Sequence, residues 1–161
     1  MREVALAQTD GCHCGAVRYE LAAPPHLAYV CNCTDCQRQT GSALAMSMPA
    51  PRAAFRLSQG DPARYERTVP SGRVGVSRFR GRCATRVYSE PFPNMVILRP
   101  GTLDDPSWIT PAAQIWTRIA RPWACIDDIL TYQQAADGFA DMAKAWAAQG
   151  LRFVGPPAAG A

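Results

Sequence analysis

Residues 11–15 read Gly-Cys-His-Cys-Gly, and residues 31–36 read Cys-Asn-Cys-Thr-Asp-Cys. The two clusters place five cysteines within 25 residues of one another. Both spacings let a turn direct two or three thiolates at one ion. Gly11 and Gly15 permit the tight backbone that such a turn requires. The pattern predicts metal-binding loops, with a cluster of reduced thiols as the alternative.

The cysteines point to metal ligation rather than to disulfide bonding. There are seven of them, namely Cys12, Cys14, Cys31, Cys33, Cys36, Cys83 and Cys125. An odd number in a chain that begins without a secretory signal argues against a disulfide framework. Zinc is the expected metal, since thiolate-rich sites suit it and the spacing differs from the ferredoxin patterns. The isolated Cys125 is expected to be a buried or inert thiol.

Six clustered cysteines exceed the roughly four ligands of one closed zinc site and suggest two sites. We therefore expect one or two zinc ions. Residues 31–36 offer three thiolates from one loop and leave a coordination position for water or substrate. Cys12 and Cys14 need a further partner from elsewhere in the chain. His13 lies between these two cysteines and is expected to be solvated rather than to act as a ligand.

The composition is that of a folded chain without membrane spans. Of the 161 residues, 48% are hydrophobic and 19% are charged, which suits one domain. We expect that domain over residues 1–154 and a disordered tail over residues 155–161. No run reaches the roughly 18 to 20 apolar residues of a membrane span. Residues 1–4 lack the apolar core of a secretory signal, so the expected location is cytoplasmic.

The net charge is a modest +4, and 16 of the 17 basic residues are arginine. The arginines are scattered along the chain, which argues against nucleic acid as a partner. Their densest group is expected to form an exposed strand face rather than an anion site. That group is Arg73, Arg78, Arg80, Arg82 and Arg86. A homodimer remains open as a further association.

Short alternating patterns separated by turn residues run through most of the chain and predict a mostly β, antiparallel fold. Residues 16–21 alternate apolar and polar side chains after a polar lead-in over residues 1–10. Residues 42–48 predict a strand that ends at Pro49 and Pro51. The other expected strands are 27–30, 54–57, 64–68, 74–80, 86–89, 95–98 and 114–119.

One segment, residues 137–149, has a clear helical period. Its apolar face consists of Phe139, Met142, Ala143 and Trp146, and Gly150 follows as a stop signal. This face is expected to pack on the core. Thr34 is expected to cap a short helical turn that contains Cys36.

The cysteine clusters lie within longer motifs, Gly11 to Tyr19 and Cys31 to Arg38. Further matching stretches are Gly41-Ser42-Ala43, residues 79–88, residues 101–105, Ile115-Trp116-Thr117 and Pro122-Trp123. Together these motifs resemble the glutathione-dependent formaldehyde-activating enzyme and centromere protein V family over most of residues 10–130. The resemblance implies an Mss4-like fold of antiparallel sheets around zinc-binding cysteine loops. It also implies a carbon–sulfur lyase activity that joins formaldehyde to glutathione reversibly.

The resemblance implies that Cys31, Cys33 and Cys36 hold a catalytic zinc ion. It further implies that the first Cys-x-Cys motif forms a structural zinc site with a later Cys-x-x-Cys-Gly motif. Here that later motif has Arg80 in place of its first cysteine and Ala84 in place of its glycine.

Only Cys12, Cys14 and Cys83 therefore remain as ligands of the structural site, because arginine has no lone pair to donate at neutral pH. Three outcomes are open: zinc with water or His13 as the fourth ligand, weaker binding, or no metal. If the metal is missing, Arg80 is expected to pair with a carboxylate such as Glu90.

Zinc on the catalytic triplet would act as a Lewis acid or would bind the sulfur of a thiol such as glutathione. Arg38 follows the triplet and is the expected anchor for a substrate carboxylate, with a helix-end surface charge as the alternative. The family often has His where this chain has Gln114.

The second hypothesis is a non-catalytic zinc-binding module of Mss4-like fold, because a fold does not determine a function. Such a module would bind its partner through exposed arginines and through Trp108, Trp116 and Trp123. Packing in the core is the favoured role for these tryptophans. A redox or iron–sulfur role for the triplet is the third possibility.

Overall fold

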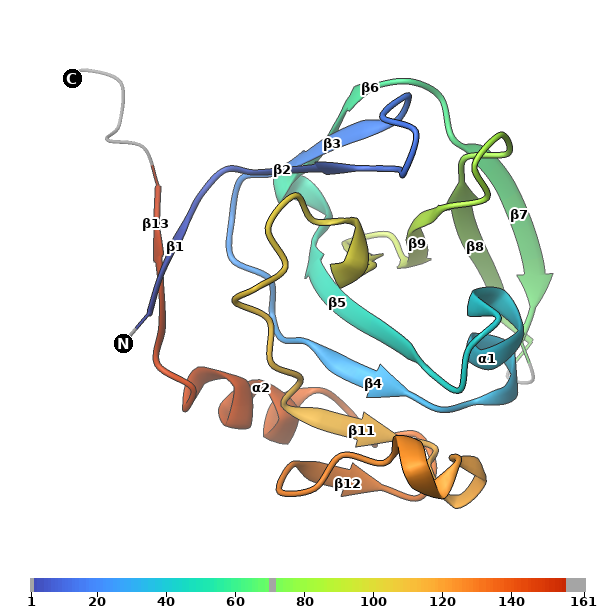
Figure 1. Ribbon diagram of the computed structural model, residues 1–161, viewed down its shortest axis with the longest axis vertical. Coiled ribbons are helices and arrows are strands. Elements are labelled where there is room, and N and C mark those ends of the chain that lie inside the picture. Colours follow the sequence, from blue (N-terminus) through green and yellow to red (C-terminus); the bar gives the residue numbers. More distant parts are fainter. Residues whose placement is uncertain (1, 70–71, 156–161) are drawn as a thin grey trace.

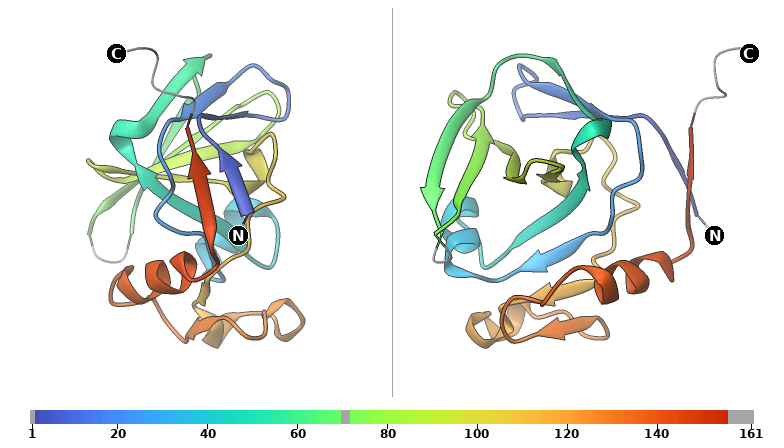
Figure 2. Two further views of the ribbon diagram at one scale, coloured as in Figure 1. Left: turned by 90° about the vertical axis from the view of Figure 1, so that its left-hand side faces the viewer. Right: turned by 180° about the vertical axis from the view of Figure 1, so that it is seen from behind.

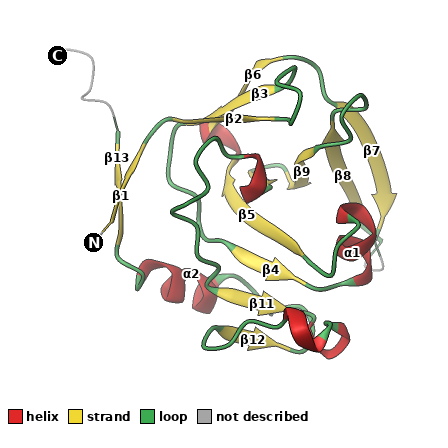
Figure 3. Ribbon diagram, in the orientation of Figure 1, coloured by secondary structure: helices red, strands yellow, loops and turns green. Residues whose placement is uncertain are grey.

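The computed structural model describes residues 2–69 and 72–155. Strands dominate this part of the chain, and a short helix near the C-terminus completes it (Figures 1 and 3). The expected mostly β fold is confirmed. Of the expected tail, residues 156–161 lie outside the described residues. No described helix has the length and apolar character needed to cross a membrane.

The largest sheet has eight strands and carries the second cysteine cluster. Its order is β12 (Leu130–Tyr132), β11 (Ala113–Ile115), β4 (Tyr29–Cys31), β5 (Ala45–Pro51), β10 (Met95–Leu98), β9 (Arg86–Phe92), β8 (Val74–Phe79) and β7 (Ala63–Thr68). Neighbouring strands are antiparallel from β4 to β7, whereas β11 runs parallel to both β4 and β12. The sheet curves, so that β7 and β8 approach helix α1 (Thr34–Thr40) near the end of β4 (Figures 1 and 2).

Two smaller sheets complete the strand arrangement. Strands β2 (Gln8–Gly11), β3 (Arg18–Leu21) and β6 (Phe55–Gln59) form an antiparallel sheet. Strand β1 (Arg2–Ala5) pairs in parallel with β13 (Leu151–Val154). The expectation of a polar lead-in over residues 1–10 was wrong. This segment contains two strands, and β1 pairs with β13 near the other end of the chain.

The prolines in β5 do not end the strand, contrary to the expectation for Pro49 and Pro51. Strand β5 continues to Pro51 and pairs there with Met95 of β10. The carbonyl of Pro49 accepts a hydrogen bond of 2.8 Å from the backbone nitrogen of His26. Since the nitrogen and carbonyl of one strand residue point the same way, Pro49 directs its missing donor away from β10.

Both α-helices are short. Helix α1 ends at Gly41, which has the left-handed conformation, with φ of 63°. Its N-cap is Cys33 rather than Thr34, so the expected cap was one residue late. Helix α2 (Ala140–Ala147) buries Met142 and Trp146, as its apolar face predicted. The 3-10 turns are η1 (Arg52–Ala54), η2 (Pro100–Thr102), η3 (Thr117–Ile119) and η4 (Pro122–Ala124).

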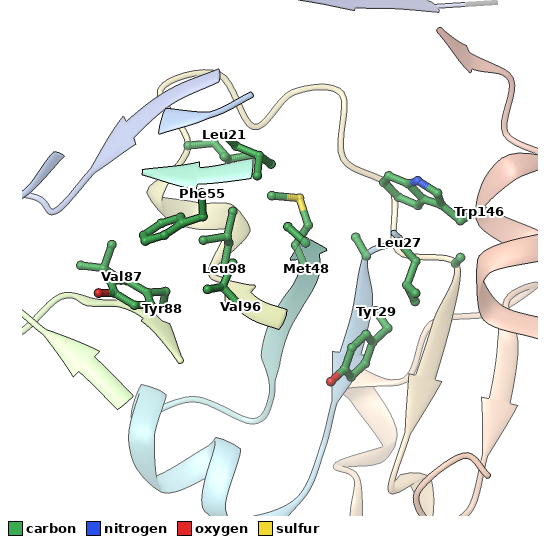
Figure 4. Packing of buried hydrophobic residues seen from close by; sticks show 14 of the residues in the cluster. Leu21, Leu27, Tyr29, Met48, Phe55, Val87, Tyr88, Val96, Leu98 and Trp146 are labelled. Atoms are coloured by element: carbon green, nitrogen blue, oxygen red, sulfur yellow. The ribbon is translucent and has the colours of Figure 1, made fainter. Parts of the chain in front are cut away.

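A single hydrophobic cluster connects the sheets and α2 (Figure 4). Phe55 packs between Tyr19 and Tyr88, with ring centroids 5.3 and 4.6 Å away. Trp108 packs against Trp146 of α2 at 6.3 Å. Aromatic burial of this kind contributes strongly to stability. The cluster includes Cys12 and Cys31, so both cysteine loops are attached to the core.

Candidate metal centre

The fold brings six cysteines together in two groups. The first triad is Cys12, Cys14 and Cys83, and the second triad is Cys31, Cys33 and Cys36. Within each triad the three sulfur atoms lie within 4.8 Å of one another. Zinc–sulfur bonds of about 2.3 Å in a tetrahedral site place neighbouring sulfurs about 3.8 Å apart. The donor type and the spacing of both triads therefore fit a zinc ion.

The first triad joins two turns that are distant in sequence. Cys12 and Cys14 lie between β2 and β3, and Cys83 lies between β8 and β9. The sulfur atoms of Cys12 and Cys14 are 3.6 Å apart, close to the tetrahedral spacing. The backbone nitrogen of Val17 donates to the sulfur of Cys12 at 3.3 Å. Hydrogen bonds from Thr85 lower the pKa of Cys83 to about 6, which favours the thiolate that a metal needs.

Cys14 is exposed, and Arg80 stands at the position of the expected fourth ligand. The Nε atom of Arg80 is shielded from solvent without a hydrogen-bond partner. The expected ion pair with Glu90 was wrong, because Glu90 accepts from Arg78 instead, at 2.8 Å. Within residues 2–69 and 72–155, only three metal-binding side chains meet at this triad. His13 is exposed and does not join them.

The second triad comes from one loop between β4 and α1. Cys31 is the last residue of β4 and is buried, Cys33 caps the helix, and Cys36 lies in its first turn. The sulfur of Cys33 accepts a hydrogen bond of 3.4 Å from the backbone nitrogen of Cys36. A helix start bears partial positive charge, which favours thiolates near it. The cap thus directs two of the three sulfurs to the same point.

Asn32 holds this loop against the neighbouring strand. It is completely buried, and its Nδ2 donates to the carbonyl of Ile115 in β11 at 3.1 Å. Its own carbonyl accepts from Nε2 of Gln37 at 2.7 Å. The first bond connects the cysteine loop to the main sheet, and the second connects helix α1 to the start of the loop. The position of the sulfurs therefore depends on β11 as well as on the loop.

The three thiols of the second triad perturb one another strongly. Hydrogen bonds from Cys31 and Cys36 lower the pKa of Cys33 to about 2. Hydrogen bonding to Cys33 and Cys36, together with burial, raises the pKa of Cys31. One thiolate is thus stabilised by two neighbouring thiols. A cation is needed before all three become thiolates at neutral pH.

The surroundings of the second triad are hollow and positively charged. Cys36 lines a hollow of about 160 Å³ together with Arg67 and Arg86. Arg86 and Arg99 line an adjoining hollow of about 390 Å³. Arg67 of β7 pairs with Asp35 of α1 across the smaller hollow. Cys36 can therefore be reached from the smaller hollow, and the adjoining larger hollow has room for a small molecule.

Both cysteine loops lie within the region that matches a known protein family. Residues 7–119 match the family model described as "Glutathione-dependent formaldehyde-activating enzyme". The chain belongs to this family. No curated protein matches the sequence. Among solved structures, a structural genomics crystal structure of a Rhodobacter sphaeroides protein is 17% identical; the match covers 77% of this chain and 98% of that chain, with a TM-score of 0.48.

Other residues that the sequence analysis singled out lie outside the two triads. Arg38 is exposed on α1 and lines none of the hollows described above. Gln114 is buried and bonds the backbone of Ile126 through both ends of its side-chain amide. Cys125 is exposed, so of the expected buried or inert thiol the buried alternative was wrong, and an inert thiol stays a prediction. Trp108 lies in the core as favoured, whereas Trp123 is 80% exposed.

Sequence reasoning missed two residues of the site in this family member. Arg86 was expected on an exposed strand face, but its Nε and Nη1 atoms are shielded from solvent. Arg99 follows β10 and also has a shielded Nε. No spacing rule distinguishes these arginines from the others in the sequence. Only the curvature of the sheet places both beside the second triad.

Proposed function

We propose that this chain is a zinc-dependent enzyme of the carbon–sulfur lyase type. Its substrate would be the adduct of glutathione, or another small thiol, with formaldehyde or a related small aldehyde. The second triad would be the catalytic zinc site. One observation carries the proposal: three cysteine sulfurs from one loop lie within 4.8 Å, and one of these cysteines lines a hollow. Membership of the family supplies the reaction class.

The proposed reaction is balanced without an oxidant or reductant. In the forward direction, the thiol sulfur forms a bond to the aldehyde carbon, and the carbonyl π bond breaks. The thiol proton ends on the resulting hydroxyl oxygen. The reverse direction breaks the carbon–sulfur bond and releases the same two molecules.

The residues of the chain prepare the site for this reaction. Asn32 and Gln37 position the loop, and burial of Cys31 excludes water from one side of the triad. Bound zinc would supply a soft Lewis acid, which with three thiolate ligands favours sulfur over hydroxide. Cys12, Cys14 and Cys83 would hold a second, structural ion with an incomplete protein ligand set.

Arg38 is our proposed anchor at the outer edge of the site, because it follows the triad by two residues on α1. Its exposure lets it reach a carboxylate of a substrate that extends beyond the hollows. Replacement by glutamine is expected to raise KM and leave kcat unchanged, which is the signature of lost uniform binding. An unchanged KM would assign Arg38 to the surface alone.

The first test is the zinc content of the chain purified without added metal. We expect one to two zinc ions per chain and the loss of one in Cys33→Ser. Cys125→Ser removes an exposed thiol that belongs to neither triad and is the matched control. An equal zinc content in wild type and Cys33→Ser, or the absence of zinc from wild type, would contradict the proposed catalytic site.

The second test follows the exchange of carbon-13 formaldehyde with glutathione by nuclear magnetic resonance. Wild type is expected to accelerate adduct formation and breakdown above the spontaneous rate, whereas Cys33→Ser is not. A zinc-loaded wild type without acceleration would favour the non-catalytic binding module. The exposed Trp123, in the turn η4, is the observation that supports that second candidate.

A further inference from the structure

Two arginines share the larger hollow beside the second triad. Arg86 begins β9 and Arg99 follows β10, and both line the hollow of about 390 Å³. Polar groups of Gln39, Thr40 and Thr102 line the same space. Arg86 and Gln39 also line the smaller hollow that contains Cys36. The two hollows therefore connect the arginine pair to the triad.

Some N–H donors of Arg86 and Arg99 have no acceptor in the described part of the protein. The Nε and Nη1 atoms of Arg86 are shielded from solvent and have no hydrogen-bond partner within the described part of the chain. Arg99 donates from Nη1 to the carbonyl of Met46 at 3.0 Å and to the hydroxyl of Ser47 at 2.8 Å, but its Nε has no partner. Buried donors without partners are rare in native proteins and indicate a missing ligand, ion or water.

The charge of the pair is also unmatched by carboxylates. In residues 2–69 and 72–155, six arginines form ion pairs, and neither Arg86 nor Arg99 is among them. Burial, and then the positive charge of Arg99, lower the pKa of Arg86 to about 10. Because a guanidinium group stays protonated at neutral pH, both side chains are cations in a partly desolvated space. Such an arrangement is costly unless an anion completes it.

The second triad supplies only part of the required negative charge. Three thiolates with one divalent cation carry a net charge of −1, whereas the two guanidinium groups carry +2. One positive charge remains for a ligand in the hollow. A carboxylate matches the planar donor fork of arginine and forms charge-assisted hydrogen bonds with it.

We propose that Arg86 and Arg99 bind a carboxylate of the thiol substrate, so that this protein selects anionic thiols over neutral ones. The inference rests on the proposed function, because it assigns the substrate class of the same site. The hollow has a volume suitable for a small peptide thiol. Arg86 is the main determinant, since it has two free donors and borders both hollows.

The test uses S-methylglutathione and its diethyl ester as probes in calorimetric titrations of the purified chain. The methyl group removes the thiol, so binding of these probes does not depend on thiolate–metal ligation. The ester lacks both carboxylates and has a similar shape. Wild type is expected to bind the diacid about tenfold or more tightly than the diester.

Arg86→Gln is expected to weaken diacid binding toward the level of the diester, with the remaining difference due to the carboxylate that Arg38 is proposed to hold. Arg86→Lys is expected to restore part of the loss. Arg121→Gln removes an exposed arginine and is the matched control, with wild-type binding expected. Circular dichroism and zinc content are measured for each variant. If Arg86→Gln does not fold, the diacid-to-diester ratio of Arg86→Lys and wild type decides the question.

Equal affinity of wild type for diacid and diester, or no saturable binding of the diacid, would overturn the inference. A change in the zinc content of Arg86→Gln without a change in the affinity ratio would also overturn it, by assigning the pair to the charge of the metal centre alone. The proposed function fails separately, when wild type contains no zinc or does not accelerate the exchange reaction. The titration still gives a result in that case.

Discussion

The Nε atom of Arg78 donates a hydrogen bond of 2.8 Å to Oε2 of Glu90, on the neighbouring strand of the main sheet. This ion pair uses the carboxylate that the sequence suggested as a partner for Arg80. Arg80 lies two residues further along the chain, at the edge of the first triad, and its Nε has no partner. Among the residues that the structure describes, the first triad therefore has neither a fourth cysteine nor an ion pair in its place.

A fourth thiolate is expected to complete this site. Arg80→Cys would supply it from the same turn as Cys83 and would remove a shielded cation beside the triad. We expect the variant to retain zinc at chelator concentrations that remove part of the zinc from wild type. Chelator competition with a colorimetric zinc indicator measures this retention.

Arg82→Cys is the matched control, because Arg82 is an exposed arginine in the same turn. It adds a thiol and removes a positive charge, but residue 82 is not the position of the first cysteine in the family's Cys-x-x-Cys-Gly motif. If both variants retain zinc equally, the position of residue 80 does not determine the affinity of the first triad.

Asn32 is expected to be necessary for the geometry of the second triad. Asn32→Ala removes the bond from Nδ2 to Ile115 and leaves that buried carbonyl with one bond fewer. The expected loss is about 1–3 kcal/mol of unfolding free energy, together with weaker zinc binding. Urea unfolding and zinc content measure the two effects. Asn94→Ala, in an exposed turn, is the control, and equal stabilities of the two variants would contradict the prediction.

Gln114 is expected to hold the loop that follows β11. Its Nε2 donates to Ile126 at 2.7 Å and to Thr131 at 3.0 Å, and its Oε1 accepts from the backbone of Ile126 at 3.1 Å. Gln114→Ala removes all three bonds, so local opening of residues 117–125 should become easier. We expect faster trypsin cleavage after Arg118, because Arg121 precedes Pro122 and trypsin does not cut an Arg–Pro bond. Cleavage at the wild-type rate would show that the 3-10 turns hold the loop without Gln114.

The Arg18–Asp104 ion pair predicts a small acid sensitivity. The hydrogen bond from Arg18 lowers the pKa of Asp104, so the ionised carboxylate favours the folded state. The stabilisation is present above the ordinary carboxyl pKa and is lost as pH falls through the lowered value. Asp104 is 50% exposed, so the effect is expected to be below about 1 kcal/mol.

Urea unfolding at pH 6 and at pH 2.5 measures this contribution. Asp104→Asn should lower stability at pH 6 and approach wild type at pH 2.5. Asp137→Asn, which changes an exposed carboxylate, should follow wild type at both values. A deficit of Asp104→Asn that is equally large at pH 2.5 would assign the effect to packing instead.

Some features were predictable because they depend on residues that are close in sequence. The spacing Cys-x-Cys-x-x-Cys places Cys31, Cys33 and Cys36 in one loop, so the second triad needs only a local turn to form. Strand β10 and the helix face of Met142 and Trp146 also follow from short-range periodicity. The place of Cys83 in the first triad came from the family resemblance instead.

Other features depend on which distant segments meet. The local pattern of residues 1–10 does not show that β1 pairs with β13, and Pro49 alone does not show that its missing donor faces away from β10. The pairing of Glu90 with Arg78 rather than Arg80 depends on strand register.

The sequence by itself determined the mostly β class, the cysteine loops with the ligand type and spacing of a metal site, and the family, because residue type and short spacing suffice for these. Only the tertiary structure decided that Arg86 and Arg99 face one hollow beside the second triad. Burial and the absence of a carboxylate partner come from the curvature of an eight-stranded sheet whose strands are far apart in sequence. A charged side chain acquires such surroundings from the whole fold, and its neighbours along the chain do not specify them.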